Sequence, residues 1–266
     1  MADYKDSLEV KTDGGRASVV VEEPLSLRID GAVFNLVRTP GCEQELAVGF
    51  CFSEGVIASI KDVLSFAYTE RGDETARNTI DVRLSDEVAV DRTRLIRAVN
   101  RRAGSSLSGR EMIDDLITRG HTWKRAAVPP PKIHVKRETL AEIPAILRES
   151  QVLHTKTGAA QAAAVFTAEG RLIVCREDIG RHNALDKAIG HLLIAKMDIR
   201  DKVLVLSGPV TYELMAKAYH SGFSVVCALA EPTSLAVAIA EKGDITLIGS
   251  LAAKGMTIYA HPERVT

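Results

Sequence analysis

The sequence predicts an α/β protein with two domains: a carboxyl-terminal domain of alternating strands and helices, and a smaller, sheet-rich α+β amino-terminal domain. Strand-like and helix-like apolar patterns alternate regularly beyond Thr139, whereas strand-like runs predominate in the first third of the chain. Between these regions, three consecutive prolines at 129–131 cannot lie inside a helix and cannot donate to a strand ladder. We therefore place the two domains at residues 15–136 and 137–266.

The amino-terminal half contains short strand-like runs, at residues 17–21, 25–29, 33–37, 64–68 and 79–84. Asp30-Gly31 joins two of them and is a strong hairpin signal, because both central positions of a type I′ turn need positive φ. A helix is predicted where apolar residues share one face, at Leu46, Ala47, Phe50 and Cys51. Gly55 is its expected C-cap, and a second helix of mixed charge is predicted at 92–99.

The carboxyl-terminal half contains short, continuous apolar runs that predict buried strands, at residues 172–175, 203–206, 224–229 and 246–248. Helical periodicity marks the segments between and after them, at residues 183–196, 212–220 and 235–241. Gly222 and Gly243 follow two of these helices as expected C-caps. This alternation predicts parallel strands joined by right-handed crossovers, with helices covering the sheet.

The composition is that of a globular protein, with 46% apolar and 26% charged residues in a chain of 266. The net charge of −1 provides no basic field for nucleic acid or for an anionic membrane surface, so neither is an expected partner. The first residues are polar and acidic, and no run of about 18 apolar residues occurs. We therefore expect a cytoplasmic protein without membrane spans.

The four cysteines, Cys42, Cys51, Cys175 and Cys227, lie far apart in apolar surroundings. None has the two-residue spacing to another cysteine that metal sites and redox pairs normally show. They are predicted to be small buried hydrophobic residues, and no metal site is predicted anywhere in the chain.

Polar residues follow the strand predicted at 172–175, where ligands of parallel sheets usually bind. This cluster includes four candidate cofactor-binding residues, Arg176, Asp178, Arg181 and His182. Arg181 is suited to bidentate binding of phosphate or carboxylate, and Asp178 to capping the next helix. The alternative is a network of salt bridges and caps that holds the strand to the helix.

Small residues follow two further predicted strands and open helices, and they are also candidate cofactor contacts: Ser207 and Gly208, and Thr233 and Ser234. Helix amino termini attract anions, although either Thr233 or Ser234 serves equally well as an ordinary N-cap. The stretch 157–160 is a similar small-residue segment that suits either backbone approach by a ligand or a turn. A basic, serine-rich loop at 101–110 is predicted to be a mobile flap near an anionic ligand or a solvated surface loop.

Several sequence blocks resemble, in the same order, those of the FdhD family of formate dehydrogenase accessory proteins. The longest is Arg-Glu-Asp-Ile-Gly-Arg-His-Asn-Ala-Leu-Asp-Lys at 176–187. The others lie at residues 38–41, 45–50, 54–57, 207–208, 213–214, 217–218, 232–237, 259 and 261–264. A series of this length is far more specific than a single short motif.

The resemblance implies a cytidine-deaminase-like carboxyl-terminal domain, with a mixed sheet and helices on both faces, that lacks the deaminase zinc. It implies partners as well: a cysteine desulfurase that supplies persulfide sulfur, and formate dehydrogenase or another molybdoenzyme as the client. The sulfur would pass to a molybdenum or tungsten bis(guanine dinucleotide) cofactor, Mo-bis(molybdopterin guanine dinucleotide) in the molybdenum form, so a GDP-like nucleotide is an expected ligand. The family also implies a homodimer.

The sequence departs from the family at the residues that carry sulfur. The two cysteines of the family's Cys-Gly-X-Cys-Gly loop correspond to Ser105 and Ser108. A hydroxyl cannot form a persulfide, so sulfur transfer is not expected from this chain, whether these serines are natural or engineered.

Two further segments differ from the family pattern. Gln161 stands at a family histidine position. The family's cofactor-binding stretch corresponds to Ser250, Leu251, Ala252, Ala253, Lys254 and Gly255, in which only Lys254 keeps a positive charge.

Two functions therefore stay open: an accessory protein of the sulfur-carrier type, and a paralogue that binds the cofactor or chaperones a molybdoenzyme without sulfur chemistry. A zinc-dependent nucleoside deaminase is disfavoured because its Pro-Cys-X-X-Cys and His-X-Glu motifs are absent.

Overall fold

The computed structural model describes residues 5–68, 78–88, 113, 116–118 and 133–266. The helix predicted at 92–99, the proline run at 129–131 and the loop with Ser105 and Ser108 lie outside the described residues.

The chain forms two compact units, neither of which is one continuous segment. Unit 1 comprises Met1–Ala103, Gln151–Gln161 and Arg176–Lys196, and unit 2 comprises Gly104–Ser150, Ala162–Cys175 and Met197–Thr266. The division into domains at 15–136 and 137–266 stays a prediction.

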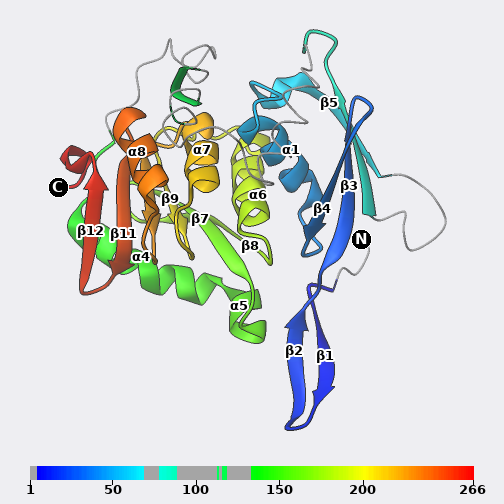
Figure 1. Cartoon of the computed structure of the whole chain (residues 1–266), viewed down its shortest axis with the longest axis horizontal. Helices are drawn as coiled ribbons and strands as arrows, with labels where there is room; N and C mark the ends of the chain where they lie inside the picture. Colours follow the sequence, from blue (N-terminus) through cyan, green and yellow to red (C-terminus); the bar gives the residue numbers. More distant parts are fainter. Residues whose placement is uncertain (1–4, 69–77, 89–112, 114–115, 119–132) are drawn as a thin grey trace. The chain divides into compact units, whose positions relative to one another are not determined.

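Unit 1 contains two antiparallel hairpins at its amino-terminal end (Figure 1). The first, β1 (Ser7–Thr12) with β2 (Gly15–Val20), forms a sheet of its own, and β1 was not predicted. The second, β3 (Glu23–Ile29) with β4 (Ala32–Arg38), belongs to a four-stranded sheet in the order β4-β3-β6-β5, with β5 at Val63–Tyr68 and β6 at Thr79–Leu84. The Asp30-Gly31 turn between β3 and β4 is confirmed, since both residues have positive φ, 42° and 82°.

Unit 1 also contains α1 (Glu43–Ser53), the short η1 (Ile60–Asp62), α5 (Val152–Thr157) and α6 (Arg181–Ile194). The predicted apolar face of α1 is buried, and Gly55 has φ 74° directly after the C-cap Glu54, as expected of a helix end. The helices α1 and α6 meet backbone to backbone, because a Cβ on Gly49 would clash with the carbonyl of Asp186 and one on Gly190 with that of Glu45. Glycine is therefore required at this crossing.

Unit 2 is built on a six-stranded sheet in the order β12-β11-β10-β9-β7-β8. Its strands are β7 (Gln161–Thr167), β8 (Leu172–Asp178), β9 (Lys202–Leu206), β10 (Val225–Ala228), β11 (Thr246–Ala252) and β12 (Gly255–Ala260). The strands β9, β10 and β11 are parallel, as predicted, but β7 and β12 are antiparallel to their neighbours. The sheet is therefore mixed, because the turn between β11 and β12 is too short for the crossover that parallel strands need.

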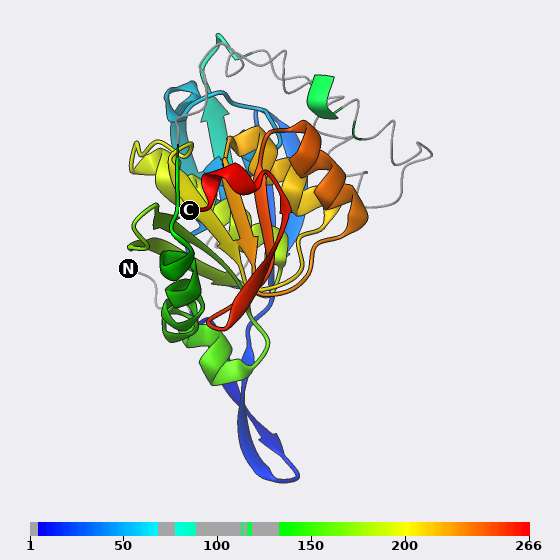
Figure 2. The same cartoon turned by 90° about the vertical axis from the view of Figure 1, so that its left-hand side faces the viewer.

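Helices cover both faces of this sheet (Figure 2). Helix α4 (Arg137–Ser150) packs on one face, where Leu140, Ile143 and Leu147 join a buried cluster with alternate residues of the strands. Helices α7 (Tyr212–Ser221) and α8 (Ser234–Lys242) lie on the other face. The short η5 (Pro262–Arg264) follows β12, and Val135 N–H donates to the carbonyl of Arg264 at 2.8 Å.

The expected α/β class with helices on both faces of a mixed sheet is thus observed. No helix among the described residues is long and apolar enough to cross a membrane. Of the four cysteines, Cys51 and Cys227 are buried as predicted, and Cys175 is half-buried against the core. The prediction is wrong for Cys42, which is exposed because it lies at the N-cap of α1 rather than on its buried face.

Candidate functional site

The longest motif of the sequence, residues 176–187, ends β8 and begins α6 in unit 1. Arg176 and Asp178 are among the last three residues of the strand β8. Arg181 is the first residue of the helix α6, and Gly180 is its N-cap. The predicted capping role of Asp178 is not observed, because Gly180 is the N-cap and no side chain among the described residues caps the helix. The Oδ1 atom of Asp178 instead accepts from the Gly180 N–H at 2.8 Å and from the Asn183 side chain at 3.1 Å.

Asp178 is fully buried and is the centre of a polar network. Its Oδ2 accepts from the Thr39 N–H at 3.2 Å and lies 2.7 Å from the Lys187 ammonium. Lys187 also donates to the Thr39 carbonyl at 2.9 Å, while the Thr39 hydroxyl accepts from the Ile179 N–H at 3.1 Å. The Asp178 carboxylate thus has four polar partners, which compensate the desolvation cost of its burial. The network therefore fixes the loop that precedes α6.

Thr39 is held in turn by a buried arginine next to it. Arg38 is fully buried, and its guanidinium lies 3.2 Å from Glu43 and 3.1 Å from Glu23. Glu43 also accepts from the Gly41 N–H at 2.6 Å, which fixes the turn into α1. The block at 38–41 therefore anchors the start of α1 and, through Thr39, the start of α6.

Arg176 makes a bidentate ion pair with Glu45 of α1, with N···O distances of 2.5 and 2.8 Å. The Nδ1 atom of His191 lies 3.0 Å from the same carboxylate. Burial alone would raise the pKa of Glu45, but the hydrogen bonds from Arg176 and His191 bring this pKa below its ordinary value. The carboxylate is thus held ionised, and Arg176 is engaged with protein groups.

Cys42 lies beside this pair, on the surface at the start of α1. Partial burial of its sulfur and the negative charge of Glu45 raise the pKa of the thiol, against the smaller opposing effect of Arg176. A raised pKa lowers the thiolate fraction, which is unfavourable for a nucleophile or a sulfur acceptor.

Arg181 is exposed on the first turn of α6, with His182 partly exposed beside it. No hydrogen bond or ion pair joins Arg181 to any residue that the structure describes. Because Asp178 and Lys187 neutralise each other, Arg181 gives the start of this helix a net positive charge. A helix amino terminus with an arginine of this kind is suited to bind an anion.

The remaining candidate residues lie in unit 2, where the parallel strands β9, β10 and β11 end at one edge of the sheet. Ser207 follows β9, and its hydroxyl accepts from the Ala162 N–H at 2.8 Å, with Gly208 next to it. Thr233 is the N-cap of α8 and accepts from the Ala236 N–H at 3.4 Å, while Ser234 begins that helix and is exposed. The capping interpretation of Thr233 is confirmed, and a ligand contact by any of these four stays a prediction.

The segment from Ser250 to Gly255 forms the end of β11, the turn and the start of β12. Leu251 is buried, whereas Ala252, Ala253, Lys254 and Gly255 are exposed. Ser250 has a left-handed φ of 48°, and its hydroxyl donates to Glu231. Whether this hairpin contacts a cofactor stays a prediction.

Glu231, which the sequence did not single out, joins the two strands of this hairpin. Its carboxylate accepts hydrogen bonds from Ser250 and Tyr259. These bonds lower the pKa of Glu231 and raise the pKa of Tyr259. Gly249 is required here, because a Cβ would lie 2.8 Å from Pro232 and 2.9 Å from the Tyr259 ring.

The structure therefore divides the predicted site residues between the two units, each described by itself. In unit 1 it brings together Arg176, Asp178, Arg181 and His182. In unit 2 the candidate residues lie along one edge of the sheet: Ser207, Gly208, Thr233, Ser234 and the segment 250–255. Ser105 and Ser108 lie outside the described residues. The stretch 157–160 is a helix end, with Gly158 as the left-handed C-cap of α5.

Residues that sequence reasoning missed are the partners Glu45, His191 and Glu231. Glu45 and Arg176 both belong to recognised sequence blocks. The sequence alone does not predict that these two side chains, 131 residues apart, form an ion pair.

Comparisons with known proteins identify the family of this chain. The model of the FdhD/NarQ family matches residues 20–266. The sulfur carrier protein FdhD of Streptomyces coelicolor is 38% identical over 254 residues, covering 93% of this chain and 89% of the relative. The protein of the same name from Saccharolobus solfataricus is 37% identical, covering 93% of this chain and 90% of the relative.

A solved structure supports the fold. The crystal structure of a formate dehydrogenase accessory protein from Desulfotalea psychrophila superposes with a TM-score of 0.72, covering 98% of this chain and 97% of that one at 19% sequence identity. At this identity the likeness concerns the fold. Because the family model and both relatives span nearly the whole chain, the chain belongs to the FdhD/NarQ family.

Proposed function

We propose that this chain is a formate dehydrogenase accessory protein of molybdenum cofactor maturation, and that it binds the guanine nucleotide portion of Mo-bis(molybdopterin guanine dinucleotide). Family membership supports the first part, since relatives that match over most of their length are named sulfur carriers. The second part depends on the chemistry of the described residues. The client would be formate dehydrogenase or another molybdoenzyme.

The observation that carries the nucleotide proposal is Arg181. It is exposed at the amino terminus of a helix of 14 residues, without an ion-pair partner among the described part of the chain. A diphosphate is an anion that such a helix start and a guanidinium bind together, through backbone N–H groups and a bidentate contact. Arg176 and Asp178 would position this helix start through their protein partners, and His182 would be a further contact on the same turn.

The edge of the unit 2 sheet, taken by itself, also offers groups that suit a nucleotide. Ser207 and Gly208 follow β9, and Thr233 with Ser234 opens α8, which provides small residues and a second helix start. Lys254 is the cationic residue of the exposed hairpin turn between β11 and β12. We propose that these residues and the hairpin 250–255 are nucleotide-contacting residues of unit 2.

Sulfur transfer is the part of the family function that we do not propose for this chain. Ser105 and Ser108 stand where the family carries cysteines, and serine cannot accept sulfane sulfur from a cysteine desulfurase. Cys42 is poorly suited to replace them, because burial and the charge of Glu45 raise the pKa of its thiol and so lower the thiolate fraction. The second candidate function, a protein that binds cofactor or chaperones a molybdoenzyme without sulfur chemistry, is favoured by this observation.

Three further parts of the proposal follow from the family resemblance. Unit 2 would have a cytidine-deaminase-like arrangement, which the parallel core β9-β10-β11 within a mixed sheet supports. The protein would act as a homodimer. It would also be located in the cytoplasm, where the cofactor is assembled.

Titration of the full chain with GDP, followed by calorimetry, tests the nucleotide proposal. We expect saturable binding that weakens at least about tenfold in Arg181→Ala, since a charge-assisted contact of this kind contributes about 1.5–3 kcal/mol. The matched control is Arg16→Ala, which removes an exposed arginine of the same unit and should bind like the parent. No binding by the parent would refute the proposal, and equal affinity in Arg181→Ala would remove Arg181 from the site.

A further inference from the structure

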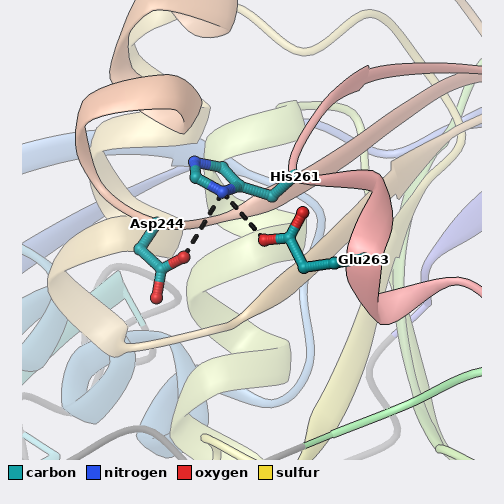
Figure 3. Close-up of side chains that lie close together, drawn as sticks. All are labelled: Asp244, His261 and Glu263. Atoms are coloured by element: carbon teal, nitrogen blue, oxygen red, sulfur yellow. Dashed lines mark hydrogen bonds and ion pairs between the residues drawn. The ribbon is translucent and has the colours of Figure 1, made fainter.

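Three side chains of unit 2 that can bind a metal converge near the carboxyl terminus (Figure 3). Asp244 follows the C-cap of α8, His261 follows β12, and Glu263 lies in η5. The Nδ1 atom of His261 lies 3.4 Å from a carboxylate oxygen of Asp244 and 3.0 Å from one of Glu263. The three potential ligand atoms all lie within 4.8 Å of one another.

The backbone determines which nitrogen of His261 carries hydrogen. The Nε2 atom lies 3.0 Å from the carbonyl oxygen of Glu241, and a carbonyl can only accept. Nε2 is therefore the protonated nitrogen of the neutral ring, and the lone pair of Nδ1 points toward two carboxylates. Acceptors that face one another repel, so this orientation is stable only with a cation at Nδ1, either a proton or a metal ion.

The distances suit a metal ion as well as a proton. With metal–nitrogen and metal–oxygen bonds of about 2.0–2.2 Å, neighbouring ligand atoms are separated by about 3.0 Å at right angles and about 3.4 Å in a tetrahedron. The two measured separations from Nδ1, 3.0 and 3.4 Å, lie in this range. A histidine ligand also typically donates its other N–H to a backbone carbonyl, as His261 does to Glu241.

The surroundings hold the ligands in place without occupying them fully. Arg264 binds the other oxygen of Asp244 at 2.7 Å, which orients that carboxylate and leaves Oδ1 directed at His261. The same guanidinium lies 3.6 Å from the Glu263 oxygen that faces His261. The hydroxyl of buried Thr246 donates to the His261 carbonyl at 2.7 Å and fixes the backbone. Asp244 and Glu263 are 55% and 60% exposed, so water has access to the remaining coordination positions.

We propose that Asp244, His261 and Glu263 form a binding site for one divalent transition-metal ion, with Zn²⁺ as the best match. One imidazole and two carboxylates suit Zn²⁺, whereas Mg²⁺ and Ca²⁺ prefer oxygen ligands alone. The ion would join the turn after α8 to η5 and so tie down the carboxyl-terminal segment. The charge of Arg264 lowers the affinity below that of closed four-ligand zinc sites. This site is separate from the proposed nucleotide site, since none of its residues takes part there.

The test is titration of the full chain, freed of metals by EDTA and dialysis, with ZnCl₂ at pH about 7.5, above the ordinary histidine range. We expect one saturable site, with affinity reduced at least about tenfold in His261→Asn and in Glu263→Gln, and weak binding of Mg²⁺ and Ca²⁺. His154→Asn is the matched control, because His154 also bonds a backbone carbonyl, that of Ala160, and should leave binding unchanged. Cys42→Ser controls for zinc on the exposed thiol.

The outcomes separate the alternatives. Retained zinc affinity in both site variants, loss of binding in Cys42→Ser, or no zinc binding by the parent would each overturn the proposal. Should His261→Asn fail to fold, anomalous diffraction at the zinc edge from soaked crystals of the parent decides the matter, since density between the three side chains supports the site and its absence refutes it.

Discussion

The ammonium of Lys187 lies 2.7 Å from the carboxylate of Asp178, and the two side chains are only 3% and 0% exposed. This ion pair has no access to solvent, so its energy depends on both partners being present. It supports the loop between β8 and α6 that presents Arg181.

Removing one partner should therefore destabilise the protein strongly. We expect Lys187→Met to lower the free energy of unfolding by about 3–5 kcal/mol, because it leaves the Asp178 carboxylate buried and uncompensated. Urea denaturation followed by circular dichroism measures this loss.

Two controls accompany this measurement. The double variant Asp178→Asn/Lys187→Met removes both charges and should lose less than Lys187→Met alone. Arg16→Met breaks the exposed pair with Glu9, 71% and 62% exposed, and should cost at most about 1 kcal/mol. A loss in Lys187→Met as small as in Arg16→Met would show that the buried pair is not formed.

The contact between α1 and α6 gives a second prediction. Gly190→Ala places a methyl group against the carbonyl of Glu45, and we expect it to cost about 1–3 kcal/mol or more of stability as the helices separate. The matched control is Gly14→Ala, where a Cβ has no atom within 4 Å and the change should stay within about 0.5 kcal/mol. Thermal unfolding of both variants checks this, and equal midpoints would contradict the close approach.

The lowered pKa of Glu45 predicts a pH dependence of stability. Because the folded-state pKa lies below the ordinary value of 4.5, the ionised carboxylate stabilises the protein above that pH, and this contribution is lost as the pH falls through the folded-state pKa. In Glu45→Gln the free energy of unfolding should depend less on pH between about pH 5 and pH 3 than in the parent. Urea titrations across this range measure the two slopes, and parallel slopes would show that Glu45 is not stabilised by Arg176 and His191.

Local features of the fold were predictable from the sequence because their causes are local. The Asp30-Gly31 turn needs positive φ at both residues. Few residue pairs adopt positive φ readily, and Asp-Gly is one of them. Strand direction is a different matter. The apolar run of β7 has no feature that distinguishes an antiparallel neighbour of β9 from a parallel one, so the mixed character of the sheet was not predictable from periodicity.

The candidate site was predictable only as separate segments. Arg181 was singled out because polar residues after a strand are a local signal. The pairing of Arg176 with Glu45 and the cluster around His261 arise when distant segments meet, and no spacing rule predicts them. Only the folded structure shows that Arg176 contacts Glu45 and so supports the site through protein contacts.

We propose that this member of the family lacks sulfur transfer because Ser105 and Ser108 stand where the family carries two cysteines. The most direct measurement compares the parent with Ser105→Cys/Ser108→Cys after incubation with a cysteine desulfurase, cysteine and pyridoxal phosphate, by intact mass of the folded protein. We predict a sulfur adduct on the double variant and none on the parent, since only a thiolate accepts sulfane sulfur. An adduct on the parent, at Cys42 or another native cysteine, or an unlabelled double variant would contradict the claim.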